Sequence, residues 1–195
     1  MPSGRKRQGA AFEASRRADL LRAAARLFVE KGFAATTTRD IAEAVGMCSG
    51  SPFYHFRSKQ DLLKAAMIEG LQAGQQRLQT AVAGIADPER RLRVMIRTHL
   101  GNLLEGDCHA PMLLYEARSL DAAARIEIAE VADGYQQTWQ ETLDELAASG
   151  RLRSSASPVR LLLVGMLNGC SQWYQPGGRL SLDEIAELAA DLLLG

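Results

Sequence analysis

Cysteine, proline and aromatic residues are scarce in this chain of 195 residues, and each scarcity excludes a class of protein. The three cysteines, Cys48, Cys108 and Cys170, are scattered and odd in number, so we expect no disulfide framework and a reducing cytoplasm as the location. Six prolines and 6% aromatic residues argue against an all-β fold. No apolar run reaches the ~18 residues that span a bilayer, and the basic segment 1–11 lacks the apolar stretch of a signal peptide.

Net charge is also absent, but the charges are unevenly distributed. Residues 1–60 hold 11 Lys and Arg against 5 Asp and Glu, whereas residues 61–195 hold 12 against 18. A basic first third joined to an acidic remainder predicts that one end meets a polyanion. Nucleic acid is the leading candidate and a membrane surface the second, and a merely solvated imbalance is the alternative to both.

What is abundant is apolar residues at helical spacing, which predict an all-α fold. In the first helix, Leu20, Ala24 and Phe28 lie on one face. With 47% hydrophobic residues, the chain can bury the core of one ordinary domain, or of a small domain joined to a larger one. The expected helices cover approximately residues 15–31, 37–45, 52–56, 58–82, 88–105, 111–119, 121–149, 157–167 and 181–192.

Polar residues at several predicted helix starts have the spacing of capping motifs, in which a side chain accepts a backbone N–H of the first turn. The pairs are Thr37 with Asp40, Ser58 with Asp61, and Ser181 with Glu184. Asp87 and Pro88 offer a cap followed by a first-turn proline. These pairs locate helix starts independently of the apolar pattern.

Residues 36–56 have the pattern of two short helices joined by a tight turn. The small Ala42 lets the helices approach, and Gly46 supplies the turn conformation. Such a helix-turn-helix can place its second helix in the major groove of DNA. The spacing alone has an alternative interpretation, because short helical hairpins also occur in many protein cores.

The wider segment, from about residue 15 to 65, resembles the DNA-binding domain of the TetR (tetracycline-repressor-like) family. The residues that carry the resemblance are Leu27-Phe28, Gly32-Phe33, Thr36-Thr37, Asp40-Ile41-Ala42, Gly46, Gly50, Phe53, His55-Phe56, Ser58-Lys59 and Leu62-Leu63. The resemblance implies an N-terminal three-helix helix-turn-helix domain followed by a C-terminal helical ligand-binding and dimerisation domain. We accordingly predict a flexible basic arm at 1–14, a DNA-binding domain at 15–60 and a ligand-binding domain at 61–195.

Two positions depart from the family pattern. Cys48 stands where the family usually has a capping Ser or Thr, although Ser49 can cap one residue later. Phe53 stands where the family favours a Tyr that meets a phosphate, and the neighbouring Tyr54 offers partial compensation.

By position in the resemblance, Arg39 reaches a base edge or a phosphate, and an arginine can pair bidentately with guanine. Residues implied to face the bases are Ser49, Gly50, Ser51 and Tyr54. Residues implied to meet phosphates are Thr37, His55 and Lys59. For Thr37 the alternative role is the helix cap, and for the arm, with Arg5, Lys6 and Arg7, the alternative is disorder.

The C-terminal stretch that includes residues 165–168 and 173–178 resembles one branch of the family, several members of which answer to acyl-CoA thioesters or other lipid-derived molecules. The alternative is that Trp173 and Tyr174 only close the end of a helical bundle. A pocket between the central helices would bind the effector. Its candidate lining residues are Met95, His99, Leu103, Met112, Tyr115, Tyr135 and Trp139, each of which has core packing as its alternative.

A metal site is not expected, since the spacing of His99, Cys108 and His109 matches no recurrent zinc pattern. No cofactor and no membrane partner is expected either. The last two apolar helices, around 161–167 and 185–194, predict a homodimer, whose paired recognition helices would bind a palindromic operator. We therefore expect a repressor that binds double-stranded DNA and is released by a small-molecule effector. An activator, an enzyme with an unrecognised motif and a helical protein-interaction module are the alternatives.

Overall fold

The computed structural model describes residues 4–47, 56–106, 109–152 and 154–194, with side chains from Ser15 onward. Within these ranges every regular element is a helix, which confirms the all-α prediction. The elements are α1 (Gly4–Lys31), α2 (Thr38–Ala44), α4 (Lys59–Val82), α5 (Pro88–Leu104), α6 (His109–Glu116), η1 (Ala117–Ser119), α7 (Ala122–Ala148), α8 (Ala156–Gly169), η2 (Cys170–Gln172) and α9 (Leu182–Leu194).

The capping signals located the helix starts correctly. Thr37 accepts the backbone N–H of Asp40 at 3.1 Å, and the Asp40 carboxylate accepts the backbone N–H of Thr37 at 2.7 Å. Caps are also present at the starts of α4, α5 and α9, from Ser58, Asp87 and Ser181. Each cap satisfies N–H groups that have no partner inside the helix.

Three predicted helix starts are wrong. α6 begins at His109 instead of at Pro111. α1 begins at Gly4 rather than at Ser15, so the backbone of residues 4–14 continues the helix. This segment is rich in helix formers and contains no proline, whereas the prediction depended on the apolar pattern alone. α8 begins at Ala156, with Ser155 at the cap position, instead of at Ser157. The helix expected at 52–56 lies outside the described residues except for Phe56.

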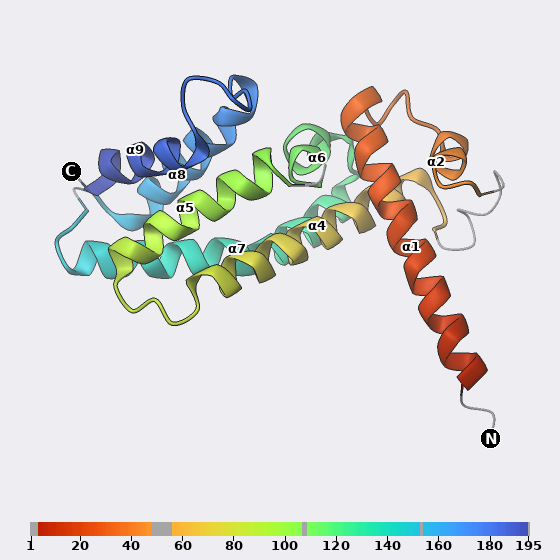
Figure 1. Cartoon of the computed structure of the whole chain (residues 1–195), viewed down its shortest axis with the longest axis horizontal. Coiled ribbons are helices and arrows are strands. Elements are labelled where there is room, and N and C mark those ends of the chain that lie inside the picture. The colour runs from red at the N-terminus through yellow and green to blue at the C-terminus, as the bar shows by residue number, and fades with distance from the viewer. Residues whose placement is uncertain (1–3, 48–55, 107–108, 153, 195) are drawn as a thin grey trace.

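Two buried apolar clusters organise the molecule. The N-terminal cluster is built around Phe28 and joins α1 and α2 to the first turns of α4, but it also includes Met112 of α6 and Ala124 of α7. The C-terminal cluster is built around Trp139 and joins α5, α7, α8, α9 and the end of α4. Figure 1 shows α4 and α7 running side by side between the two ends of the molecule.

The N-terminal cluster therefore extends beyond residue 60, because the DNA-binding segment shares its apolar core with α6 and α7.

As for membranes, none of the described helices is both long enough and apolar enough to cross one.

Candidate DNA-binding segment and effector pocket

The loop between α1 and α2 is fixed by buried hydrogen bonds. The hydroxyl of Thr36, fully buried, donates to the carbonyl oxygens of Leu27 and Gly32. Gly32 ends α1 with a φ of +80°, a conformation that favours glycine. The start of α2 is thereby held at a set position on α1.

Lys59 also holds this loop. Its ammonium donates to the carbonyl oxygens of Phe33 at 2.7 Å and Thr36 at 2.9 Å, with a longer contact to Ala34 at 3.4 Å. It lies 4.3 Å from the centre of the Phe33 ring. An ammonium has three N–H donors, and all three are directed at the chain itself. The structure therefore gives Lys59 a positioning role, and its predicted phosphate contact stays a prediction.

Two of the other predicted DNA contacts are described by the structure. Thr37 caps α2, and its predicted phosphate contact stays a prediction. Arg39 is exposed over 76% of its side chain and pairs with Glu43 on the next turn at 2.8 Å, a bond that raises the pKa of its guanidinium. This pair is in solvent and is easily exchanged. The remaining candidates lie outside the described residues: Ser49, Gly50, Ser51, Tyr54 and His55.

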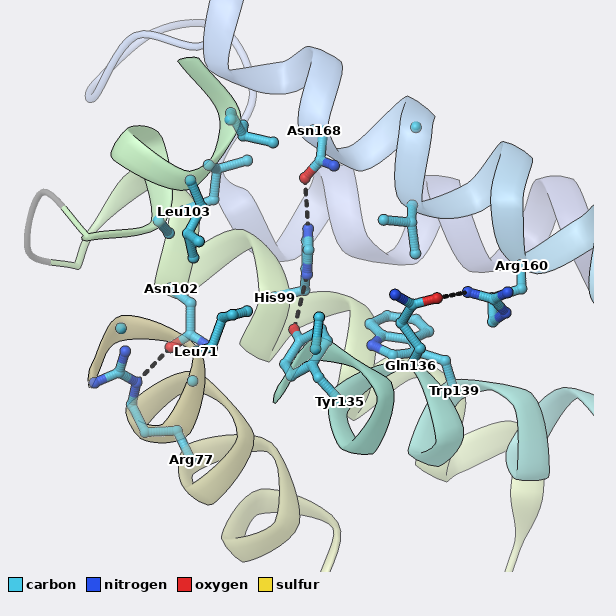
Figure 2. A pocket seen from close by; sticks show the side chains of 18 of the residues that line it. Leu71, Arg77, His99, Asn102, Leu103, Tyr135, Gln136, Trp139, Arg160 and Asn168 are labelled. Carbon is cyan, nitrogen blue, oxygen red and sulfur yellow. Dashed lines mark hydrogen bonds between the residues drawn. The ribbon is translucent and has the colours of Figure 1, made fainter. Parts of the chain in front are cut away.

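A cavity of about 460 Å³ opens between α4, α5, α6, α7 and α8. Its apolar walls include Leu71, Leu103, Leu113, Leu114, Trp139, Leu161 and Val164. Its polar residues are Arg77, His99, Asn102, Tyr135, Gln136, Arg160 and Asn168 (Figure 2). Gly70 and Gly74, one turn apart on α4, leave room for this space.

Four of the seven residues predicted for the pocket lie in its wall: His99, Leu103, Tyr135 and Trp139. The other three are corrections. Met95 and Met112 are completely buried in the two apolar clusters, and Tyr115 is 41% exposed, with its hydroxyl 2.9 Å from that of Ser171. One face of α5 carries Met95, His99 and Leu103. Met95 on this face packs in the core, whereas His99 and Leu103 line the cavity.

Sequence reasoning missed the amides and arginines of the pocket, and the contribution of α4. Asn102 and Asn168 interrupt apolar stretches of α5 and α8, and this is the signal by which they could have been found. Arg77 and the two glycines carry no such signal, because α4 has polar residues on several faces.

A hydrogen-bonded chain crosses the cavity from α7 to α8 through His99. Nδ1 of His99 lies 2.8 Å from the Tyr135 hydroxyl, and Nε2 lies 3.0 Å from Oδ1 of Asn168 (Figure 2). Since Oδ1 can only accept, Nε2 carries the proton and Nδ1 accepts from Tyr135. Burial lowers the pKa of His99, opposed by the Asn168 bond, and burial raises the pKa of Tyr135 to about 12. Both groups are therefore neutral at pH 7.

α6 is a wall shared by the pocket and the DNA-binding segment. Leu113 and Leu114 line the cavity, while Met112 is buried against α1 in the N-terminal cluster. α6 also approaches α4 closely, since a Cβ on Gly70 would lie 2.6 Å from Cβ of His109. A movement of α6 would therefore displace side chains both in the cavity wall and in the N-terminal cluster.

Large apolar side chains are exposed on α8 and α9. Leu162 is 74% exposed and Leu192 is 76% exposed, and the same surface includes Leu161, Met166 and Leu188. One chain therefore covers only part of the apolar surface of α8 and α9.

As for metals, among the described residues no group of three or more His, Cys, Asp or Glu side chains is arranged to hold an ion.

Comparisons with known proteins give the family. The chain is 29% identical over 187 residues to the HTH-type transcriptional repressor KstR2 of Mycolicibacterium smegmatis, which covers 93% of this chain and 90% of KstR2. The solved structure of AibR in complex with isovaleryl coenzyme A and operator DNA has a TM-score of 0.85 at 26% identity, covering 92% of this chain and 98% of AibR. The structure of the superantigen PfiT has a TM-score of 0.80 at 36% identity, covering 91% of this chain and 95% of PfiT.

Two family matches together span most of the chain. Residues 20–66 match the bacterial regulatory proteins of the tetR family, and residues 86–195 match the tetracyclin repressor-like C-terminal domain. The second match alone covers more than half of the 195 residues. With its helix-turn-helix segment and its all-helical C-terminal part, this chain belongs to the TetR family of transcriptional regulators.

Proposed function

We propose that this regulator is a repressor that binds a palindromic operator as a homodimer and leaves it when a small apolar effector enters the cavity. The observation that carries the proposal is the cavity itself, because one of its walls, α6, also packs in the core of the DNA-binding segment. KstR2 is a repressor, and AibR has been solved with isovaleryl coenzyme A and operator DNA. Both similarities support the proposal.

On the DNA side, Arg39 is the leading described contact. Its guanidinium is exposed, and its solvent ion pair with Glu43 can be replaced by a base edge or a phosphate at little cost. Ser49, Gly50, Ser51 and Tyr54 remain the proposed base-facing residues, and His55 remains a proposed phosphate contact.

An acyl-CoA-type thioester is the leading effector class, and another hydrophobic compound is the alternative. The cavity is mostly apolar, which suits an acyl chain. Two guanidiniums also line it, those of Arg77 and Arg160, and they suit the phosphates of a coenzyme A headgroup. Each is held by an amide rather than by a carboxylate: Arg77 donates to Asn102, and Arg160 donates to Gln136 and Gln140.

Release would follow from a shift between two arrangements of α6 and α4. The effector must bind the released arrangement more tightly, since equal affinity for both would shift nothing. Besides the α6 contacts, the amide of Gln60 on the first turn of α4 donates to the carbonyl of Ser119 at 2.7 Å. Lys64, one turn further, pairs with Glu127 at 2.9 Å. These contacts couple the start of α4, next to the DNA-binding segment, to η1 and α7.

The dimer is proposed to form through the exposed apolar surface of α8 and α9. Leu162→Asp places a charge on this surface, where Leu162 is 74% exposed, and should give monomers in light scattering after size exclusion. Ile126→Asp is the matched control, because Ile126 is 63% exposed on α7, and it should leave the dimer intact. A wild-type monomer at micromolar concentration would contradict this part of the proposal.

The deciding experiment is fluorescence anisotropy with labelled DNA from upstream of the chain's own gene, titrated with isovaleryl-CoA, longer acyl-CoA thioesters and unrelated apolar compounds. Tight, salt-sensitive binding that a thioester reverses is the expected result. Reversal only by another apolar compound would replace the thioester class. Failure to bind this DNA or any DNA selected from a random pool, together with an Arg39→Ala variant that behaves as wild type, would favour the interaction module.

A further inference from the structure

Two N–H donors in the cavity wall are buried and lack a hydrogen-bond partner among the described residues. They are Nε1 of Trp139, whose side chain is 1% exposed, and Nδ2 of Asn102. An indole N–H can only donate, and so can the NH₂ of an amide. Buried polar groups are nearly always paired in native proteins, so two unpaired donors in one cavity call for an explanation.

The orientation of the Asn102 amide is fixed by the hydrogen bond that its oxygen accepts. Its Oδ1 accepts from Nε of Arg77 at 2.6 Å, which directs Nδ2 away from Arg77 (Figure 2). Nδ2 is buried, and a Cβ placed on Gly74 would be in ordinary van der Waals contact with it at 3.9 Å.

The indole nitrogen of Trp139 lies on the side of its ring that faces Tyr135 (Figure 2). Weak side-chain hydrogen bonds from Trp139 and Asn102 to the Tyr135 hydroxyl lower its pKa against the larger effect of burial, but neither contact has full hydrogen-bond geometry. The Tyr135 proton is directed to His99. The two donors therefore both lie beside the Tyr135 hydroxyl, in one corner of a cavity whose walls are mostly apolar.

We propose that this corner binds an acceptor oxygen of the effector, a carbonyl, through the N–H groups of Trp139 and Asn102. This inference rests on the proposed function and narrows its effector to apolar molecules that carry a carbonyl, such as thioesters, esters and ketones. One carbonyl oxygen has two lone pairs and can accept both donors. The apolar part would lie along Leu71, Leu103 and Val164, whereas an amine or another donor-only group would meet two donors and be rejected.

The test compares 2-heptanone with 2-methyl-1-heptene, in which a methylidene group replaces the carbonyl oxygen at nearly the same shape. Protein labelled with ¹⁵N gives one indole signal each for Trp139 and Trp173, and a Trp173→Phe variant assigns them. At millimolar ketone, the Trp139 indole proton should move downfield, as a new hydrogen bond requires. The alkene should bind without this shift.

A variant supplies the second measurement. Asn102→Asp removes the donor but keeps an acceptor for Arg77, and it should weaken the ketone relative to the alkene about tenfold. Gln136→Glu is the matched control, because it adds the same charge to the same cavity and keeps the partner of Arg160. It should leave the ratio of the two affinities unchanged.

Three results would overturn the inference: no binding of the ketone, binding without the indole shift, or an equal change of the affinity ratio in Asn102→Asp and Gln136→Glu. These measurements involve no DNA. A failure of the repressor proposal would instead appear as a lack of operator binding in the anisotropy experiment, so the two failures are distinguishable.

Discussion

Thr36 and Trp139 are both almost completely buried, but the hydroxyl of Thr36 makes two hydrogen bonds whereas the indole N–H of Trp139 has no partner in the described part of the chain. The same contrast separates their surroundings. Around Thr36, the polar groups of Thr37 and Lys59 are used by neighbouring atoms of the same segment. Around Trp139, Asn102 also has a donor left over.

The difference teaches what each region is for. In the DNA-binding segment, Thr36, Thr37 and Lys59 hold the start of α2 through internal hydrogen bonds, although Oε1 of Gln60 at the start of α4 is buried without a partner among the described residues. In the cavity, the proposed effector would use the donors that Trp139 and Asn102 leave unpaired, and burying these donors unpaired costs stability. Changes that remove polar groups should therefore have opposite effects in the two regions.

The largest effect is expected in the N-terminal region, from Lys59→Met. The variant keeps the aliphatic stem over Phe33 but removes the ammonium from its carbonyl partners, which should lower the free energy of unfolding by about 2 kcal/mol. Lys64→Met is the control, since it removes only a partly exposed pair with Glu127 and should cost about 0.5 kcal/mol. Urea denaturation followed by circular dichroism measures both. Equal losses would contradict the positioning role of Lys59.

Next in size is a change at the wall that joins the two regions. In Gly70→Ala the new Cβ would lie 2.6 Å from Cβ of His109, so α6 must shift away from α4. Operator affinity should fall about tenfold without any effector, roughly 1.4 kcal/mol. Gly74→Ala, whose Cβ has 3.9 Å to its nearest neighbour, should leave operator affinity unchanged. Anisotropy titrations of the two variants decide whether α6 transmits the signal.

Thr36→Val keeps the shape of the side chain and removes its two hydrogen bonds. Because the site is fully buried, the free energy of unfolding should fall by about 1 kcal/mol. Thr80→Val removes a similar bond, to the carbonyl of Gln76 at 2.8 Å, on an exposed part of α4 and should be nearly neutral. A neutral Thr36→Val in the same urea titration would show that the loop does not depend on this hydroxyl.

In the cavity, Asn102→Leu should have the opposite sign. It removes the buried unpaired Nδ2 at the expense of one partly exposed bond to Arg77, so the free energy of unfolding should rise by about 0.5 kcal/mol. Effector binding should be lost in the same variant. Destabilisation comparable to that of Thr36→Val would abolish the contrast between the two regions.

The smallest effect concerns pH and His99. Burial lowers the pKa of His99 below its ordinary value of 6.5, so the unfolded chain binds this proton more readily than the folded one. Its contribution to stability is present above pH 6.5 and is lost as the pH falls below that value. The amide of His99→Gln can still hydrogen-bond to Tyr135 and Asn168 but does not titrate. This variant should therefore lose less stability than the wild type between pH 7 and 5. Parallel pH profiles would show that His99 contributes nothing.

Much of the local structure could be predicted from the sequence. Thr37 with Asp40, and Ser58 with Asp61, located the starts of α2 and α4 because a cap depends only on residues three positions apart. The start of α1 was missed because a helix-forming segment without an apolar pattern gives no such signal.

The pocket could be predicted only in part, for a geometric reason. The spacing that places Met95, His99 and Leu103 on one face of α5 is the same whether that face meets a side chain or an empty space. Likewise, the carbonyl partners of Lys59 lie up to 26 residues away, beyond the reach of any local pattern.

By itself, the sequence determined most of the helices and the caps at their starts, because these follow from interactions between near neighbours in the chain. The helix-turn-helix segment was predicted from its spacing together with the family resemblance. Only the tertiary structure decided that Met95 is core while His99 lines a cavity, that Lys59 holds a loop, and that Trp139 and Asn102 keep unpaired donors. Those outcomes depend on which atoms of distant helices fill, or leave open, the space beside each side chain.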